Sequence, residues 1–187
     1  MKRKVMIIGA GGIGSYLIPL LDKTNLYKIT VYDPDIVEKK NLTYQNYSAN
    51  EVDNNKAECM NNRYSSVVNS QPYLVLTENQ IKGYDLVICC ADNLDVRRLL
   101  YRCSEQWLDL RSQGRNGAYI SYKTPKSMYD VVLAGPDGSF SCQGNEWDGK
   151  NEGLHFTHVA IAGMGAEWMQ RWFINNDDVA DYKVVNI

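Results

Sequence analysis

The chain has 187 residues, of which 44% are hydrophobic and 22% charged, and its formal net charge is -2. This composition is typical of a globular protein, and the length fits a single domain over residues 1–187. The weak negative charge argues against a general nucleic-acid surface, and no apolar run approaches the roughly 20 residues that span a membrane. Since no signal peptide precedes the first predicted strand, we expect a cytoplasmic protein.

Strands and helices alternate along most of the chain, which predicts a parallel sheet with helices on both faces. The predicted strands are 4–8, 28–32, 73–76, 86–90 and 107–110, and the predicted helices are 12–22, 52–68 and 93–104. Beyond them, alternating residues at 117–123 and 127–133 predict an antiparallel hairpin, and 155–174 predicts a long helix. The expected fold class is therefore α/β: a Rossmann-like, doubly wound and mostly parallel sheet, extended by an antiparallel hairpin, with a long C-terminal helix.

A glycine-rich turn joins the first predicted strand to the first helix. Gly9, Gly11 and Gly14 have the spacing G-x-G-x-x-G, which lets a phosphate approach bare backbone N–H groups at a helix N-terminus. Asp33 ends the second predicted strand, nineteen positions after Gly14, where an acidic residue binds ribose hydroxyls. Both features predict a nucleotide site, and by themselves they also fit an NAD(P)-dependent oxidoreductase.

The next segment narrows the choice of nucleotide. Residues 33–45 read D-P-D-I-V-E-K-K-N-L-T-Y-Q, followed by Asn55-Lys56-Ala57 and by the run 90–97, C-A-D-N-L-D-V-R. These motifs, in this order, resemble those of the ThiF, MoeB and ubiquitin-activating family of adenylating enzymes. The resemblance extends from about residue 5 into the 120s, whereas an oxidoreductase would explain only the glycines and Asp33.

The resemblance implies ATP-dependent adenylation of the C-terminal carboxylate of a small ubiquitin-like or sulfur-carrier protein or peptide. It implies that Lys56 neutralises phosphate charge and that Asp92 holds the Mg²⁺ that accompanies ATP. The residues implied for nucleotide binding are Gly9, Gly11, Gly12, Gly14, Ser15, Asp33, Asp35, Asn41, Gln45, Lys56, Asn93 and Arg97. Simpler interpretations remain open: Asp92 as a helix cap, Lys56 as a solvated lysine, and Arg97 as the partner of a nearby acid.

The sequence departs from the family pattern at two points that matter for catalysis and metal binding. Tyr44 stands where the family carries an arginine that contacts ATP phosphates, and Arg111 and Arg115 are candidate replacements. This change raises the alternative of a degenerate, non-catalytic nucleotide- or partner-binding module. The chain has no C-x-x-C pair, so we expect no stoichiometric zinc.

The five cysteines predict free thiols in a reducing compartment, because their number is odd and their spacing fits no metal framework. Cys142 lies in a polar segment that we expect to be exposed. Family members often place a cysteine in this region, where in some of them it takes over the activated carrier. A catalytic thiol at Cys142 is therefore one interpretation, and an incidental cysteine is the other.

The C-terminal helix is rich in aromatic residues and small residues. Trp168, Trp172 and Phe173 offer more aromatic surface than we expect one helix to bury, and Gly163 and Gly165 would let another backbone approach. Because relatives of the resembled family also form dimers, we expect a homodimer. The alternative is that the tryptophans fill the domain's own core.

Overall fold

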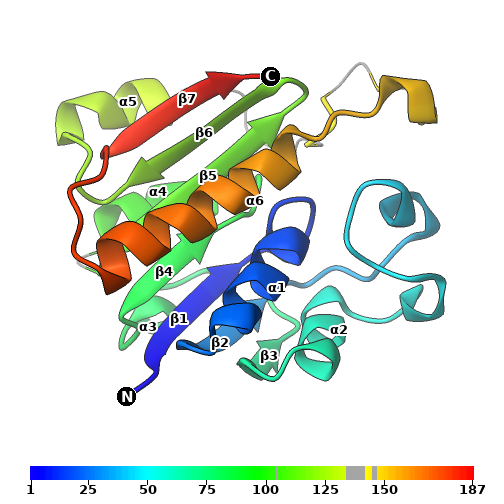
Figure 1. Ribbon diagram of the computed structural model, residues 1–187, viewed down its shortest axis with the longest axis horizontal. Coiled ribbons are helices and arrows are strands. Elements are labelled where there is room, and N and C mark those ends of the chain that lie inside the picture. The colour runs from blue at the N-terminus through cyan, green and yellow to red at the C-terminus, as the bar shows by residue number, and fades with distance from the viewer. Residues whose placement is uncertain (104, 134–141, 145–146) are drawn as a thin grey trace.

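A seven-stranded sheet organises the computed structural model, which describes residues 1–103, 105–133, 142–144 and 147–187. The strand order is β3-β2-β1-β4-β5-β6-β7; β1 to β5 pair in parallel, and β6 and β7 extend the sheet antiparallel (Figure 1). The strands are β1 Arg3–Ile8, β2 Tyr27–Tyr32, β3 Val67–Gln71, β4 Leu86–Cys89, β5 Trp107–Gln113, β6 Asn116–Ser121 and β7 Tyr182–Asn186. The predicted Rossmann-like fold class is confirmed.

Helices cover both faces of this sheet (Figure 1). The helices are α1 Gly14–Thr24, α2 Lys56–Arg63, α3 Glu78–Ile81, α4 Leu94–Arg102, α5 Tyr129–Val132 and α6 Thr157–Trp168. Shorter 3-10 helices are Lys39–Thr43, Ala49–Glu51, Lys126–Met128 and Asn151–Gly153, and a π-helical turn, Met169–Ile174, continues α6. In the described part of the chain, no helix is both long and apolar enough to cross a membrane.

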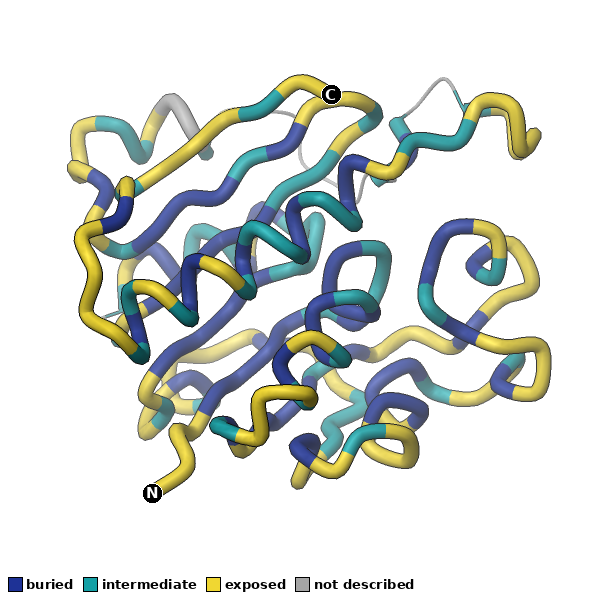
Figure 2. The backbone as a smooth tube through the Cα atoms, viewed as in Figure 1, coloured by how far each residue is buried: buried dark blue, intermediate teal, exposed yellow. Residues whose placement is uncertain are grey.

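Two hydrophobic cores lie on opposite faces of the sheet because successive strand side chains point in opposite directions. In β1, Val5 and Ile7 belong to the core beneath α1, α2 and α6. Met6 and Ile8 belong to the core beneath α3, α4 and α5. The central strands are therefore buried from both sides, whereas β7 at the edge is largely exposed (Figure 2).

The predicted hairpin is wrong in its second arm. β6 pairs with β5, not with a strand at 127–133, and residues 126–132 are helical. Tyr129 and Leu133 both pack on the second core, and the backbone N–H of Leu133 donates to the carbonyl of Tyr129 at 2.8 Å, which is the hydrogen bond of a helical turn. The other neighbour of β6 is β7, which the sequence analysis did not predict.

The third strand was also misplaced. The helix predicted over 52–68 is the shorter α2, and β3 begins at Val67, whose Cα is paired with that of Ile29 in β2. The predicted helix wrongly included Val67 and Val68, although β-branched residues favour strands. Residues 73–76, predicted as a strand, are instead a loop at the end of the sheet that carries the cavity described below.

The aromatic residues of the C-terminal helix mostly fill the protein's own core. Trp168 and Phe173 are buried, and a Cβ on Gly165 would lie only 2.7 Å from a methyl carbon of Leu110 in β5. These contacts favour the alternative interpretation of the tryptophans. They remove the main observation behind the predicted homodimer, which stays an untested prediction.

Candidate functional site

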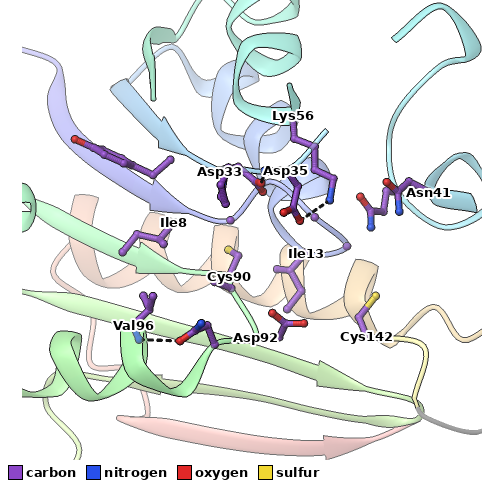
Figure 3. Close-up of a pocket in the computed structure, with 18 of the residues that line it drawn as sticks. Ile8, Ile13, Asp33, Asp35, Asn41, Lys56, Cys90, Asp92, Val96 and Cys142 are labelled. Atoms are coloured by element: carbon purple, nitrogen blue, oxygen red, sulfur yellow. Dashed lines mark hydrogen bonds and ion pairs between the residues drawn. The ribbon is translucent and has the colours of Figure 1, made fainter. Parts of the chain in front are cut away.

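A cavity of about 720 Å³ lies at the carboxyl ends of β1, β2 and β4. Chain connections leave β1 and β4 in opposite directions along the sheet here, the place where open α/β sheets bind ligands. Twelve of the predicted site residues line this cavity: Gly9, Gly11, Gly12, Asp33, Asp35, Asn41, Gln45, Lys56, Asp92, Asn93, Arg97 and Cys142. The sheet therefore gathers residues as far apart in the sequence as Asp33 and Cys142 around one cavity (Figure 3).

The glycines of the turn have different roles. Gly9 has a φ of +95°, and a Cβ on Gly14 would lie 2.0 Å from the carbonyl oxygen of Gly9, so the turn itself requires both. A Cβ on Gly11 would meet only the flexible Gln45 amide, at 3.9 Å. Gly11 therefore presents open backbone to the cavity, as phosphate binding requires.

Ser15 and Gly14 are not among the residues that line the cavity. Ser15 is fully buried, and its Oγ accepts a hydrogen bond from the backbone N–H of Asn46 at 3.0 Å. This contact ties α1 to the segment that carries Gln45. The position of Ser15 favours a structural role over the predicted contact with the nucleotide.

Asp33 is a buried carboxylate fixed in the cavity wall. Its oxygens accept the backbone N–H groups of Ala10 at 2.6 Å and Asp35 at 2.9 Å. Burial raises the pKa of Asp33, and the nearby charge of Lys56 opposes that rise. The carboxylate links the end of β2 to the glycine turn, which holds it where ribose hydroxyls could donate to it.

Lys56 begins α2 and is buried in the same wall, with 7% of its side chain exposed. Its Nζ lies 3.1 Å from Oδ2 of Asp35, which is itself 66% exposed (Figure 3). The preceding Asn55 caps α2 by accepting from Glu58 N, and its amide donates to the backbone carbonyls of Asp33 and Asp35. Lys56 is therefore not a solvated helix lysine, because the fold places its ammonium group beside the cavity.

The 3-10 helix Lys39–Thr43 presents Asn41 and, just after it, Gln45. Asn41 Oδ1 accepts from Glu38 N at 2.9 Å, and the Glu38 side chain accepts from Asn41 N, so the two residues cap this helix reciprocally. Gln45 is 7% exposed, and its Oε1 has no hydrogen-bond partner among the described residues. A buried acceptor without a partner, in a cavity wall, is suited to a donor on a ligand.

Asp92 and Asn93 divide two roles that the sequence could not separate. Asn93 caps α4, because its Oδ1 accepts from Asp95 N at 2.8 Å and Val96 N at 3.2 Å. Asp92 is thus relieved of capping and lines the cavity on the side of β4 (Figure 3). Its carboxylate is one of the hard oxygen ligands in the cavity wall, the type of ligand that magnesium prefers.

A buried ion-pair network stands behind Arg97. Arg97 Nε lies 3.2 Å from the fully buried Asp109, which also accepts from Arg111 at 2.6 Å and from Tyr101 Oη at 2.9 Å. Arg97 also lines the cavity. The alternative interpretation, that Arg97 pairs with a nearby acid, is therefore compatible with its place in the candidate site. Sequence reasoning missed Asp109, because an acidic residue within an apolar strand does not reveal which side chains the fold places around it.

The Tyr44 side chain packs against neighbouring rings and offers no positive charge to a ligand. Its ring is edge-on to Trp147, with centroids 5.3 Å apart, and its carbonyl lies 2.7 Å from Nε2 of the buried His158. Burial lowers the pKa of His158. Arg111 is engaged with Asp109 and is not among the lining residues, so it does not take the place of an arginine at position 44.

Cys142 is half-buried against the glycine turn, contrary to the expected exposed thiol. A Cβ on Gly12 would lie 2.5 Å from Cys142 Sγ, and the Cys142 carbonyl accepts from Gly114 N at 3.0 Å. Burial raises the pKa of this thiol to about 11, so it is protonated at neutral pH. The sulfur nonetheless lies at the turn where nucleotide phosphates are expected.

Alkylation of Cys142 should therefore be slow at neutral pH and should accelerate as the pH rises toward 11. The reactive thiolate is scarce below the pKa and grows about tenfold per pH unit. Iodoacetamide labelling, with Cys142 followed by peptide mass spectrometry between pH 7 and 10, measures this slope. Fast labelling that levels off near pH 8 would contradict the buried, protonated thiol.

The cavity also has an apolar side that the sequence analysis missed. Tyr73, Leu74 and Val75, which follow β3, line the same cavity as Asp33. An aromatic and aliphatic wall next to a ribose-type acid is suited to a planar base. These residues were predicted as a strand, and only their position after the true β3 reveals their place.

Comparison with known proteins identifies the family of this chain. Residues 1–166 match the model of the ThiF family. The chain belongs to the ThiF family. A probable molybdopterin-synthase adenylyltransferase from Pyropia yezoensis is 30% identical over 141 residues, covering 69% of this chain and 36% of that protein.

Two further relatives and one solved structure show how far the similarity extends. The adenylyltransferase and sulfurtransferase UBA4 of Yarrowia lipolytica is 30% identical over 53% of this chain and 27% of its own length. Ubiquitin-like modifier-activating enzyme 5 of Drosophila erecta is 23% identical over 96% and 52%. The crystal structure of E. coli MccB with ATP superposes with a TM-score of 0.72 at 16% identity, covering 99% of this chain and 60% of that one. The chain thus spans between about a quarter and a half of these curated relatives, and the MccB likeness shows the fold.

Proposed function

We propose that this protein binds ATP with Mg²⁺ and adenylates the C-terminal carboxylate of a small ubiquitin-like or sulfur-carrier protein or peptide. The observation that carries the proposal is the convergence of Asp33, Lys56 and Asp92 around open backbone at Gly11 in one cavity. An adenylating site needs a nucleoside anchor, a phosphate cation and a metal carboxylate, and these three residues supply them. We further propose that residues 1–187 act as one nucleotide-binding domain.

In the proposed reaction, a carboxylate oxygen of the substrate forms a bond to the α-phosphorus of ATP. The bond between the α- and β-phosphates breaks, and pyrophosphate leaves with the bonding electrons. The protein's part is to orient the nucleotide and neutralise charge: Asp33 binds the ribose, and Lys56 faces the phosphates. Asp92 would hold Mg²⁺, which supplies Lewis-acid stabilisation of phosphate charge when bound.

A second candidate is a module that binds nucleotide or a partner without catalysis. Tyr44 favours it, because this residue is packed between Trp147 and His158 and brings no positive charge to the cavity. An NAD(P)-dependent oxidoreductase is less well supported, since it leaves Lys56 and Asp92 in the cavity without a role.

Exchange of labelled pyrophosphate into ATP tests the proposal and separates the two candidates. The protein would be incubated with ATP, Mg²⁺ and a panel of peptides that end in a free carboxylate, with the same peptides amidated as controls. Exchange that needs the free carboxylate is expected. ATP binding without exchange, for peptides and for small ubiquitin-like proteins alike, would favour the non-catalytic module.

A further inference from the structure

We propose that Lys40 binds the phosphate chain of the nucleotide and supplies the mobile positive charge that the cavity otherwise lacks. The inference rests on the proposed function, since it assumes that the ligand is ATP. It starts from the three cationic side chains among the described residues that line the cavity: Lys40, Lys56 and Arg97.

Two of these three cations are held by other groups. Lys56 is buried and paired with Asp35 at 3.1 Å, and Arg97 is paired with the fully buried Asp109 at 3.2 Å. Removing Arg97 from Asp109 would weaken the compensation of a buried carboxylate, which is costly. Arg97 is therefore poorly placed to move toward a ligand.

Lys40 is the cavity cation that is free to move at little cost. Its side chain is 63% exposed, and its Nζ pairs with Glu38 at 3.0 Å, where Glu38 is itself 53% exposed. Exposed ion pairs of this kind contribute little to stability. Glu38 keeps its role in capping the 3-10 helix Lys39–Thr43 when Lys40 leaves, because it also accepts from Asn41 N.

The charge balance of the cavity calls for such a cation. Asp33, Asp35, Glu38 and Asp92 line it, so four carboxylates face three cations before any phosphate enters. A triphosphate adds further negative charge, and Mg²⁺ offsets only part of it. A flexible lysine that exchanges an exposed carboxylate for a phosphate supplies charge where it is needed.

Tyr44 follows the same 3-10 helix four residues after Lys40, and both line the cavity. The Tyr44 ring is held by Trp147 and His158. On this short segment the phosphate contact therefore falls to Lys40. Lys39 is the adjacent lysine on the same helix, is exposed and is not among the lining residues, which makes it a matched control.

The test compares the wild-type protein with Lys40→Ala, Lys40→Arg and Lys39→Ala by calorimetric titration with ATP and with adenosine, both with Mg²⁺. We expect Lys40→Ala to weaken ATP binding about tenfold or more, the range of a lost charged hydrogen bond, and to leave adenosine binding unchanged. Lys40→Arg should retain most of the ATP affinity, and Lys39→Ala should bind ATP like the wild type.

The outcomes separate this inference from the proposed function. If the wild type binds ATP and Lys40→Ala binds it equally well, Lys40 does not contact phosphate, while the proposed function stands. If Lys40→Ala loses ATP and adenosine alike, or if Lys39→Ala shows the same loss as Lys40→Ala, a specific phosphate contact is overturned. Failure of the wild type to bind ATP would overturn the proposed function and this inference together.

Discussion

Replacing Asp92 by alanine should reduce pyrophosphate exchange at least about a hundredfold while leaving the protein folded. The carboxylate lies in the cavity wall and is not needed to cap α4, because Asn93 does that. Loss of the residue proposed to hold Mg²⁺ removes charge stabilisation worth several kcal/mol in the transition state. The exchange rate with saturating ATP and Mg²⁺, together with the unfolding midpoint, measures both parts of the prediction.

Asp95→Ala is the matched control for this variant. Asp95 lies on the first turn of the same helix, is 85% exposed, and pairs with Arg98 at 2.9 Å at the surface. Its removal should change exchange little. Equal activity of Asp92→Ala and the wild type would show that Asp92 is not the metal carboxylate.

Replacing Gly14 by alanine should destabilise the fold by about 3 kcal/mol, near the upper end of the usual cost of overpacking. The new Cβ would lie 2.0 Å from the Gly9 carbonyl oxygen, a rigid backbone atom at the start of the turn. Either the turn must open or α1 must shift from β1. Urea unfolding of the variant and the wild type measures the loss of free energy of unfolding, provided that this free energy depends equally steeply on urea in both proteins.

Gly11→Ala gives the opposite result, because space is open at that position. Its Cβ would meet only the Gln45 amide at 3.9 Å, so stability should change by less than about 1 kcal/mol. ATP affinity should fall, because the methyl group occupies the backbone surface proposed for phosphate. A Gly11→Ala protein that unfolds like Gly14→Ala, or that binds ATP unchanged, would contradict this division of roles.

Local sequence patterns predicted the central strands of the sheet and the glycine turn. The apolar runs of β1, β2, β4 and β5 and the glycine turn fixed the central sheet, since a buried parallel strand reads as a continuous apolar run. The signals failed toward both edges. β7 is a short edge strand whose apolar residues, Tyr182, Val184 and Val185, stay largely exposed, and its pairing with β6 joins segments that are far apart in the sequence.

The candidate site was predicted from motifs, and its internal connections were not. The order of the motifs placed Asp33 and Asp92 after strands and Lys56 at the start of a helix, and the sheet brings all three to one cavity. The pairing of Arg97 with Asp109, and the burial of Cys142 against Gly12, depend on residues distant in sequence. Burial and the choice of partner follow from tertiary packing, which residue spacing in the sequence does not reveal.

The central claim, that this cavity binds ATP with Mg²⁺, is tested most directly by thermal unfolding of the wild-type protein with ATP–Mg²⁺ and, separately, with NAD at the same concentration. A ligand that binds only the native state at a hundred times its dissociation constant adds about 2.7 kcal/mol of stability. We expect ATP–Mg²⁺ to raise the unfolding midpoint by several degrees and NAD to leave it unchanged. A rise with NAD and none with ATP–Mg²⁺ would contradict the central claim.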